Sequence, residues 1–275
     1  MAITAKQVNE LRQKTGAGMM DCKKALVEAD GDMDAAIDLL RKKGQKVAAK
    51  RGDREATEGL VIAKTSENGS KGVLICLNCE TDFVAKNEDF GKLANAFTDL
   101  AVANNVSSVE DFKKLSFDGI TVEEKIVEQT GVIGEKIDIS GLEVVEANKV
   151  VAYNHPGNQI ATIVGFNKDG DIEETGRQVA MQVAAMAPIA VDSDSVDEAT
   201  IAREIEVGKE LAIQEGKPAE MAEKIAQGRL NKFFKESTLL NQAFVRDNKL
   251  SVKQFLQETD KDLTVTDFKR ISLSI

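Results

Sequence analysis

The chain has 275 residues and a formal net charge of −10, with 36 Lys and Arg against 46 Asp and Glu. This acidic balance argues against broad binding to nucleic acid or to a membrane surface, because phosphates select clustered cations. The length favours two or three domains, and 42% apolar with 30% charged residues is typical of a soluble globular protein.

The first fifty residues have helical periodicity. Their apolar positions predict three short helices between Lys6 and Gly44, with Asp32 capping the third helix and Gly44 ending it. Three helices in so short a stretch form a small bundle. The basic, polar residues 46–58 then predict a linker, which is either a solvated hinge or a contact for an acidic partner or RNA.

A β-hairpin followed by a helix comes next. Strands at 60–63 and 72–77 flank the turn at 67–70, whose Asn-Gly pair is a strong hairpin signal. The following helix carries Phe90 and Phe97 on its apolar face.

The same arrangement then recurs. Strands at 150–153 and 160–164 flank the turn at 155–158, and a helix follows with Val179, Val183 and Met186 on one face. A strand at 137–146 lies between the two copies, and the apolar run at 263–268 supplies a third strand to the second copy. We therefore expect an α+β fold, in which two related halves with antiparallel sheets and helices follow the helical bundle.

A helical hairpin is inserted in the second half, at 195–237. One stripe of small and apolar residues reaches Ala212, Gly216 ends the first helix, and Pro218 begins the second. Met221 and Leu230 continue the stripe on the second helix. The stripe is either the seam of an antiparallel hairpin or a docking face, so the hairpin is also a candidate surface for self-association.

These patterns predict three domains. They are residues 1–53, with the helical module and the basic linker; residues 54–146, the N-terminal half of the core; and residues 147–275, the C-terminal half with the hairpin at 195–237.

The cysteines do not indicate metal or redox chemistry. Cys76 and Cys79 form a lone Cys-x-x-Cys, whereas a zinc site needs four ligands and a redox motif begins at a helix N-terminus. Strand alternation places these two thiols on opposite faces of the sheet. We expect small core residues, since Cys22 and His155 lie far away in the sequence, and we assign no metal site.

The sequence contains no motif that is typical of an enzyme active site. His155 is the one histidine, and it lies in a predicted turn with no nucleophile motif beside it. The glycines at 131–134 and 16–18 lack the spacing of nucleotide-binding loops. We expect no catalytic residue and no cofactor.

The sequence also lacks segments for a membrane or for export. No stretch approaches the roughly 18 apolar residues that span a bilayer, and no apolar signal region precedes the first helix. Together with the absence of a disulfide framework, this predicts a cytoplasmic protein.

The segment 78–87 is the most informative part of the chain. It lies where the first hairpin ends and a helix begins, and it places Asp82 beside Phe83. An exposed Phe gains nothing in a free protein, so this pair suggests a contact surface for another macromolecule. The alternative is that Phe83 belongs to the core and covers the helix that starts near Phe90, while Asp82 caps a helical turn.

Two long motifs resemble the elongation factor Ts family. The first comprises residues 15–26 and 30–37, and the second comprises residues 78–86 with Thr81-Asp82-Phe83-Val84 at its centre. The likeness covers nearly the whole chain, in the right order. It implies that the N-terminal helices form a module of the ubiquitin-associated type.

The resemblance also implies a function. The family promotes guanine-nucleotide exchange on elongation factor Tu, the GTPase that delivers aminoacyl-tRNA to the ribosome. Asp82 and Phe83 would be the pair that intrudes near the magnesium and phosphate site of the GTPase, with Thr81 and Val84 shaping the turn.

Secondary contacts to the GTPase follow from the same resemblance. Ile133, Gly134 and His155 match other core positions near that surface. Of Met19 and Met20, at least one is expected in the core of the small bundle and the other against the partner.

Two other functions compete. A non-catalytic adaptor would bind another protein through the helical module and use the α+β core as a scaffold. A thiol enzyme would act through Cys79. Loss of Phe83 leaves an adaptor intact, whereas Cys79→Ser abolishes thiol chemistry.

Overall fold

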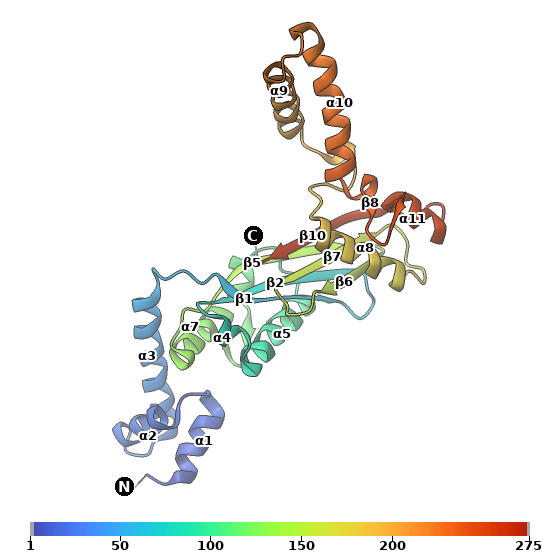
Figure 1. Cartoon of the computed structure of the whole chain (residues 1–275). Helices are drawn as coiled ribbons and strands as arrows, with labels where there is room; N and C mark the ends of the chain where they lie inside the picture. Colours follow the sequence, from blue (N-terminus) through green and yellow to red (C-terminus); the bar gives the residue numbers. More distant parts are fainter. Residues whose placement is uncertain (1–2, 274–275) are drawn as a thin grey trace.

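The computed structural model describes residues 3–273, with the side chain of Ala219 left out. The molecule is elongated, with three helices at one end, a helical hairpin at the other and a mixed core of helices and antiparallel strands between them (Figure 1). The predicted α+β class is confirmed.

The N-terminal helices pack around a small core of their own. They are α1 (Ala5–Thr15), α2 (Met19–Glu28) and α3 (Met33–Arg51). Leu11, Cys22 and Leu26 are fully buried between them. The Asp32 side chain accepts a hydrogen bond from the Ala35 N–H, so it caps α3 as predicted.

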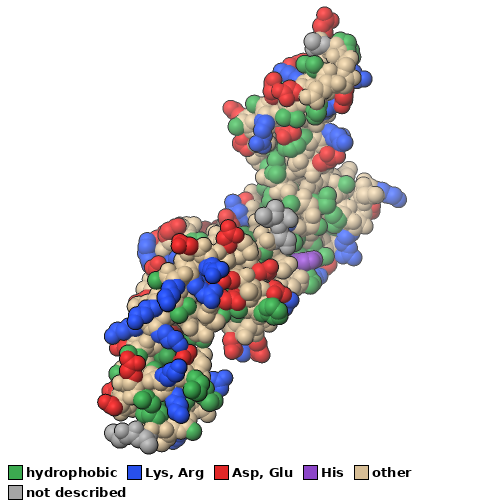
Figure 2. Space-filling view, turned by 60° about the vertical axis from the view of Figure 1, so that its left-hand side comes forward, with side chains coloured by type: hydrophobic (Ala, Val, Ile, Leu, Met, Phe, Trp, Pro, Cys, Tyr) green, Lys and Arg blue, Asp and Glu red, His purple; other side chains and the backbone are tan. Residues whose placement is uncertain are grey.

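The prediction that α3 ends at Gly44 is wrong, because the helix continues to Arg51. Gly44 lies where α3 crosses α7 (Val122–Ile133), and a Cβ placed on Gly131 of α7 would lie 2.3 Å from the Gly44 Cα. Glycine at both positions allows the two helices to pack closely. This packing outweighs the loss of helix stability, about 1 kcal/mol relative to Ala, that glycine causes inside a helix. Lys46, Lys50 and Arg51, which we expected in a linker, belong to α3 instead, and Lys and Arg side chains are frequent on the surface at the N-terminal end of the molecule (Figure 2).

Two three-stranded antiparallel sheets have equivalent strand orders. In each sheet, the central strand pairs on one side with its hairpin partner. On the other side it pairs with the strand of that sheet that comes last in the sequence. The first sheet comprises β1 (Glu58–Thr65), β2 (Lys71–Cys79) and β5 (Asp138–Glu146), and the second comprises β6 (Lys149–Asn154), β7 (Ile160–Phe166) and β10 (Val265–Ser272). The expected third strand of the second sheet is therefore present.

The two sheets pack face to face. Val61 and Leu74 of the first sheet and Ile163 of the second are fully buried in the shared core. Each such side chain contributes about 1.5–3 kcal/mol when it leaves water. This contact fixes the position of one half relative to the other.

Helices cover the outer face of each sheet, which makes four layers (Figure 1). Phe90 and Phe97 of α5 are buried on the first sheet, as predicted. On α8, Val179 and Val183 are buried but Met186 is 47% exposed, so its predicted place on that face is wrong. The covering helices are α5 (Glu88–Ala103), α6 (Val109–Lys113) and α7 on the first sheet, and α8 (Glu173–Met186) and α11 (Val252–Thr259) on the second.

Short elements complete the core. They are the helix α4 (Asp82–Ala85), the ladder of β3 (Ser116–Phe117) with β4 (Ile120–Thr121), and the ladder of β8 (Ala243–Phe244) with β9 (Asp247–Ser251).

The helical hairpin consists of α9 (Glu198–Gln214) and α10 (Ala219–Ser237). Small residues form its seam, where Gly208 packs on Ala226. The expected stripe is correct at Ala212 and Leu230 and wrong at Met221, which is 51% exposed. Successive helix positions differ by about 100°, so the seam of α10 runs through the buried Ala222 and Ala226 instead. The predicted domain boundaries, after residues 53 and 146, stay predictions.

Candidate functional site

The segment Thr81–Val84 forms a one-turn helix directly after β2. Thr81 is the N-cap of α4, and no residue of α4 is buried. Phe83 is 83% exposed, whereas Val84 packs partly against the core under the first sheet. One side of the segment, with Val84, therefore packs on the core, and the other side, with Phe83, is free. The alternative that Phe83 is a core residue is wrong.

Asp82 lies on the free side with a cation of its own. Lys86 Nζ donates to Asp82 Oδ2 over 2.6 Å, one helical turn away. This hydrogen bond lowers the pKa of the Asp82 carboxyl from its ordinary value. At neutral pH the tip of the segment thus presents a carboxylate and an aromatic ring side by side.

Glu135 fixes the root of the segment. Its carboxylate accepts two hydrogen bonds from Thr81, one from the backbone N–H (3.0 Å) and one from Oγ1 (2.8 Å). Glu135 follows Gly134, the left-handed C-cap of α7 with φ 81°. The bonds of Glu135 thereby bring the end of α7, with Ile133 and Gly134, close to Thr81, although Thr81 and Glu135 are 54 positions apart in the sequence.

A second carboxylate ties the same root to the N-terminal helices. Glu80 accepts two bonds from Arg51 Nη1 (2.8 and 2.7 Å) and one from the Lys136 N–H (2.6 Å). The Lys136 N–H above all, followed by Arg51, lowers the pKa of Glu80. Lys136 Nζ also donates to the carbonyls of Gly52 and Arg54. The residues after α3 are therefore bonded to the core. Of the predicted linker, residues 46–51 are helical instead, and the choice between a solvated hinge and a partner contact stays a prediction.

His155 is exposed in the turn between β6 and β7, as predicted. The Tyr153 hydroxyl lies 3.0 Å from His155 Nδ1. The same turn bonds to β1, where the Val61 N–H donates to the Asn158 carbonyl (2.7 Å). Glu58, at the start of β1, pairs with Cys79 just before the Thr81 segment. Three strand residues span roughly 10 Å, so the turn that carries His155 and the residues before Thr81 both contact the first half of β1.

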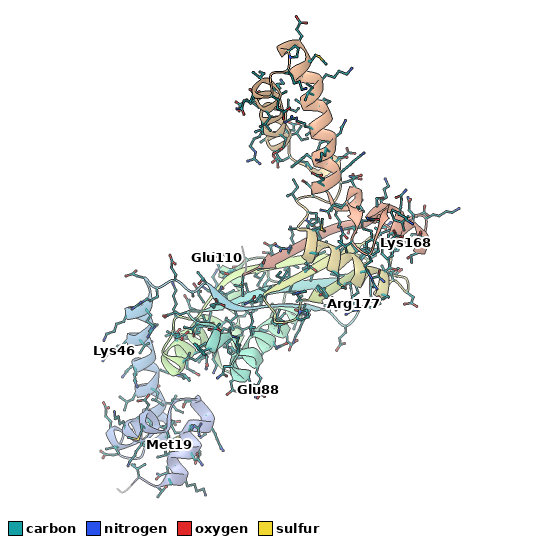
Figure 3. All side chains as sticks on the ribbon, viewed as in Figure 1. Met19, Lys46, Glu88, Glu110, Lys168 and Arg177 are labelled. Atoms are coloured by element: carbon teal, nitrogen blue, oxygen red, sulfur yellow. The ribbon has the colours of Figure 1, made fainter. Side chains whose placement is uncertain are left out.

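Met19 and Met20 lie at the start of α2, in the N-terminal helices and away from α4 (Figure 3). Both are exposed, by 56% and 63%, so the prediction that at least one belongs to the core is wrong. Val27 is 58% exposed and follows Met20 by two helical turns. The exposed side of α2, with Met19, Met20 and Val27, is thus a second apolar surface, separate from Phe83.

The cysteines are all buried thiols. Cys76 faces the core between the sheets and Cys79 faces the helices, as strand alternation predicts. Burial, reinforced by the charge of Glu135, raises the pKa of Cys79 to about 12. A thiol with that pKa is not a nucleophile at neutral pH. Within residues 3–273, no three or more His, Cys, Asp or Glu side chains are arranged to hold a metal ion.

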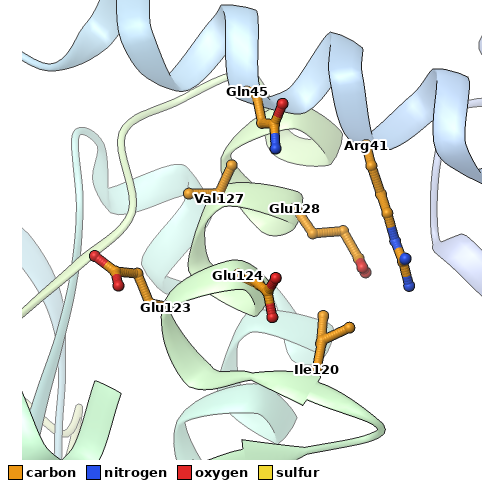
Figure 4. Close-up of a pocket in the computed structure, with 7 residues that line it drawn as sticks. All are labelled: Arg41, Gln45, Ile120, Glu123, Glu124, Val127 and Glu128. Atoms are coloured by element: carbon orange, nitrogen blue, oxygen red, sulfur yellow. The ribbon is translucent and has the colours of Figure 1, made fainter. Parts of the chain in front are cut away.

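A cavity of about 280 Å³ lies between α3 and α7 (Figure 4). Two of its acidic groups, Glu124 and Glu128, already have partners inside the protein. Glu128 pairs with Lys125 at 2.7 Å, and Glu124 closes a capping box with Thr121. We assign no ligand to it. Its lining residues are Arg41, Gln45, Ile120, Glu123, Glu124, Val127 and Glu128.

Within the described part of the chain, no helix combines the length and the apolar character needed to cross a membrane.

The family model and the individual relatives of this chain point to the same family. The family model for elongation factor Ts matches residues 80–274. Elongation factor Ts of Christiangramia forsetii is 55% identical over 272 residues, covering 98% of both chains. That of Flavobacterium psychrophilum is 53% identical over 272 residues, again covering 98% of both. That of Porphyromonas gingivalis is 42% identical over 275 residues, covering 100% of this chain and 99% of its own. The chain belongs to the elongation factor Ts family of translation elongation factors.

Proposed function

We propose that this chain is a guanine-nucleotide exchange factor for elongation factor Tu. It binds the GTPase in its GDP form, disturbs the magnesium and phosphate site through Thr81–Val84, and so promotes release of GDP and its exchange for GTP. The observation that carries the proposal is the 83% exposure of Phe83 on a root that is hydrogen-bonded to the core. Family membership supports the choice of partner.

The mechanism needs no covalent chemistry. Magnesium demands near-ideal octahedral geometry, so a small displacement of the elements around it weakens nucleotide binding. Phe83 gains about 1.5–3 kcal/mol if the GTPase encloses it. The chain weakens GDP binding only by the factor by which it binds the displaced state of the GTPase more tightly than the GDP-bound state. GDP must in turn weaken the binding of the chain to the GTPase by the same factor.

Asp82 and Phe83 have separate roles in this mechanism. The ring supplies apolar contact between elements of the GTPase. The carboxylate, which the Lys86 hydrogen bond keeps ionised at neutral pH, opposes the phosphates and competes for their positive partners. The two side chains therefore act on packing and on charge at the same site.

Further contacts extend this surface. Ile133 and Gly134 directly precede Glu135, which bonds to Thr81 at the root of the segment, and the turn that carries His155 bonds to β1. The exposed Met19 and Met20 favour a separate contact, made by the N-terminal helices as a module of the ubiquitin-associated type. We place the whole reaction in the cytoplasm, where translation occurs.

The adaptor alternative uses the α2 surface alone. It rests on the exposure of Met19 and Met20, and it gives Phe83 no role. The two functions differ in one result, because an adaptor binds its partner without changing the rate of nucleotide release.

The test is release of fluorescent GDP from purified elongation factor Tu, followed by stopped flow with and without this chain. We expect acceleration that saturates with concentration. Absence of acceleration at saturating protein rules out the exchange function and favours the adaptor.

A further inference from the structure

The helix that carries Phe83 is too short to orient itself. α4 has four residues, whereas isolated helices shorter than roughly 12–15 residues are marginal in water. Its direction must come from contacts outside the helix. Val84 and Ala85 pack on the core from one side, and the backbone of Thr81 needs a partner on the other.

The turn after α7 supplies that partner. Glu135 takes both donors of Thr81, while its neighbour Lys136 donates its N–H to Glu80. Two successive residues of the turn thus hold two successive residues of the root. A pair of such bonds fixes a direction, which a single bond does not.

The same turn is tied to the N-terminal helices. Arg51, the last residue of α3, donates twice to Glu80. The contact of Gly44 with Gly131 packs α3 against α7 shortly before both helices end. The end of α3, the end of α7 and the root of α4 therefore meet at one junction, made by Arg51, Glu80, Thr81, Glu135 and Lys136.

Burial strengthens the junction. The Glu80 and Arg51 side chains are 16% and 35% exposed. Charge-assisted hydrogen bonds are about twice as strong as neutral ones, and removal of one partner leaves the other unpaired. The junction is thus better able to hold α4 than an exposed ion pair such as that of Lys86 with Asp82.

We propose that Glu135 and Glu80 are positioning residues for exchange, and that this junction orients the Asp82–Phe83 tip before the partner arrives. The inference rests on the proposed exchange function. A preoriented tip avoids the entropy of ordering α4 in the complex. Because the N-terminal helices make a separate contact in the proposed complex, this benefit appears in the later step, when the tip enters the GTPase. The junction also aligns α3, and with it the Met19 and Met20 surface, with the tip.

The test uses the full chain and GDP release from elongation factor Tu. Glu135→Ala should lower the maximal release rate about tenfold, with a small change in the half-saturating concentration and only a small fall in the melting temperature, because the donors of Thr81 lose their acceptor. Glu135→Gln keeps an oxygen that accepts from Thr81 and should restore most of the rate. Arg51→Ala, which cuts the bond to α3, should lower the maximal rate by a smaller factor.

A matched control lies in the hairpin. Glu215 follows α9 as Glu135 follows α7, and it accepts two bonds from Arg229 at 2.7 and 2.8 Å. Glu215→Ala likewise removes a carboxylate that accepts two hydrogen bonds, but far from α4, and should leave the release rate at the wild-type value.

Phe83→Ala separates this inference from the function on which it rests. The double variant with Glu135→Ala should be no slower than Phe83→Ala alone, because Glu135 acts through the tip. If Phe83→Ala keeps the wild-type rate, the exchange mechanism itself is wrong. If Phe83→Ala is slow and Glu135→Ala is not, the positioning role alone is wrong.

Amide hydrogen exchange in the free protein gives an independent readout. The amides of residues 83–87 should exchange faster in Glu135→Ala than in the wild type or in Glu215→Ala. Equal exchange in all three overturns the proposal whatever the release rates are.

Discussion

Neighbouring residues at the root of α4 differ in what they do for the stability of the chain. Glu80 stabilises the fold through Arg51 and Lys136, and it stands one position before the exposed segment. Phe83, by contrast, adds little to the stability of the free chain, because a substitution at so exposed a site changes the free energy of unfolding by no more than about 0.5 kcal/mol. Stability and contact are thus divided between neighbouring residues.

Glu80 makes the stability of the chain depend on pH. Its pKa in the folded protein lies below the ordinary value of about 4.3 of the unfolded chain. Its contribution is therefore complete well above that value and is lost as the pH falls through the folded pKa. Glu80→Gln should lower the free energy of unfolding by about 1–3 kcal/mol at pH 7, and the difference from wild type should shrink in acid.

Urea unfolding at pH 7 and at the lowest pH at which both proteins fold measures this difference. Glu110→Gln, at an exposed carboxylate (Figure 3), controls for the loss of one acidic charge. A difference between wild type and Glu80→Gln that is the same at both pH values would contradict the role given to this carboxylate.

At the scale of elements, the sequence predicted the order of helices and strands but missed several faces and ends. Hairpin signals and apolar spacing depend on neighbouring residues, and both hairpins and the buried face of α5 were correct. The length of α3 depends on Gly131, which lies far along the chain and receives Gly44. No local pattern contains that information.

In the candidate site, too, some features were predictable from local sequence and others were not. Exposure of Phe83 was predictable from its position at a junction and from the motif around it. The roles of Glu80 and Glu135 were not, since each carboxylate bonds to a residue more than 25 positions away. A charged residue beside a motif is most often solvated, and the sequence alone cannot distinguish it from an anchor.

Packing of α3 on α7 can be tested with two glycines. Gly131→Ala should destabilise the chain by about 1–3 kcal/mol, because its Cβ meets the backbone of Gly44. Gly228→Ala, in the exposed part of α10 with nothing within 4 Å of its Cβ, should stabilise the chain by about 0.5–1 kcal/mol. Thermal unfolding of both variants measures the two effects. Equal shifts in the same direction would show that the helix crossing is not tight.

For the whole molecule, the layout separates three surfaces. The N-terminal helices and the hairpin lie at opposite ends, with the Thr81–Val84 segment between them on the core (Figure 1). A partner that contacts both α2 and α4 must therefore extend along one side of the molecule. The hairpin remains available for a different contact.

Self-association through the hairpin is a prediction at this scale. Val207, Leu211, Ile213 and Met221 are between 41% and 56% exposed, which leaves apolar area that a second copy would remove from water. The sedimentation coefficient should rise with concentration, and Leu211→Lys should reduce that rise. Gln227→Lys adds the same charge at an exposed polar site of α10 and is the control. A single 29.8 kDa species at all concentrations would contradict the prediction.

The most direct test of the central claim is the maximal rate of GDP release from elongation factor Tu at saturating wild-type chain and saturating Phe83→Ala. Because Phe83 is 83% exposed, the variant should keep the wild-type melting temperature. We predict that its maximal rate falls at least tenfold, the factor that corresponds to about 1.4 kcal/mol of lost contact. An unchanged maximal rate for Phe83→Ala would contradict the account.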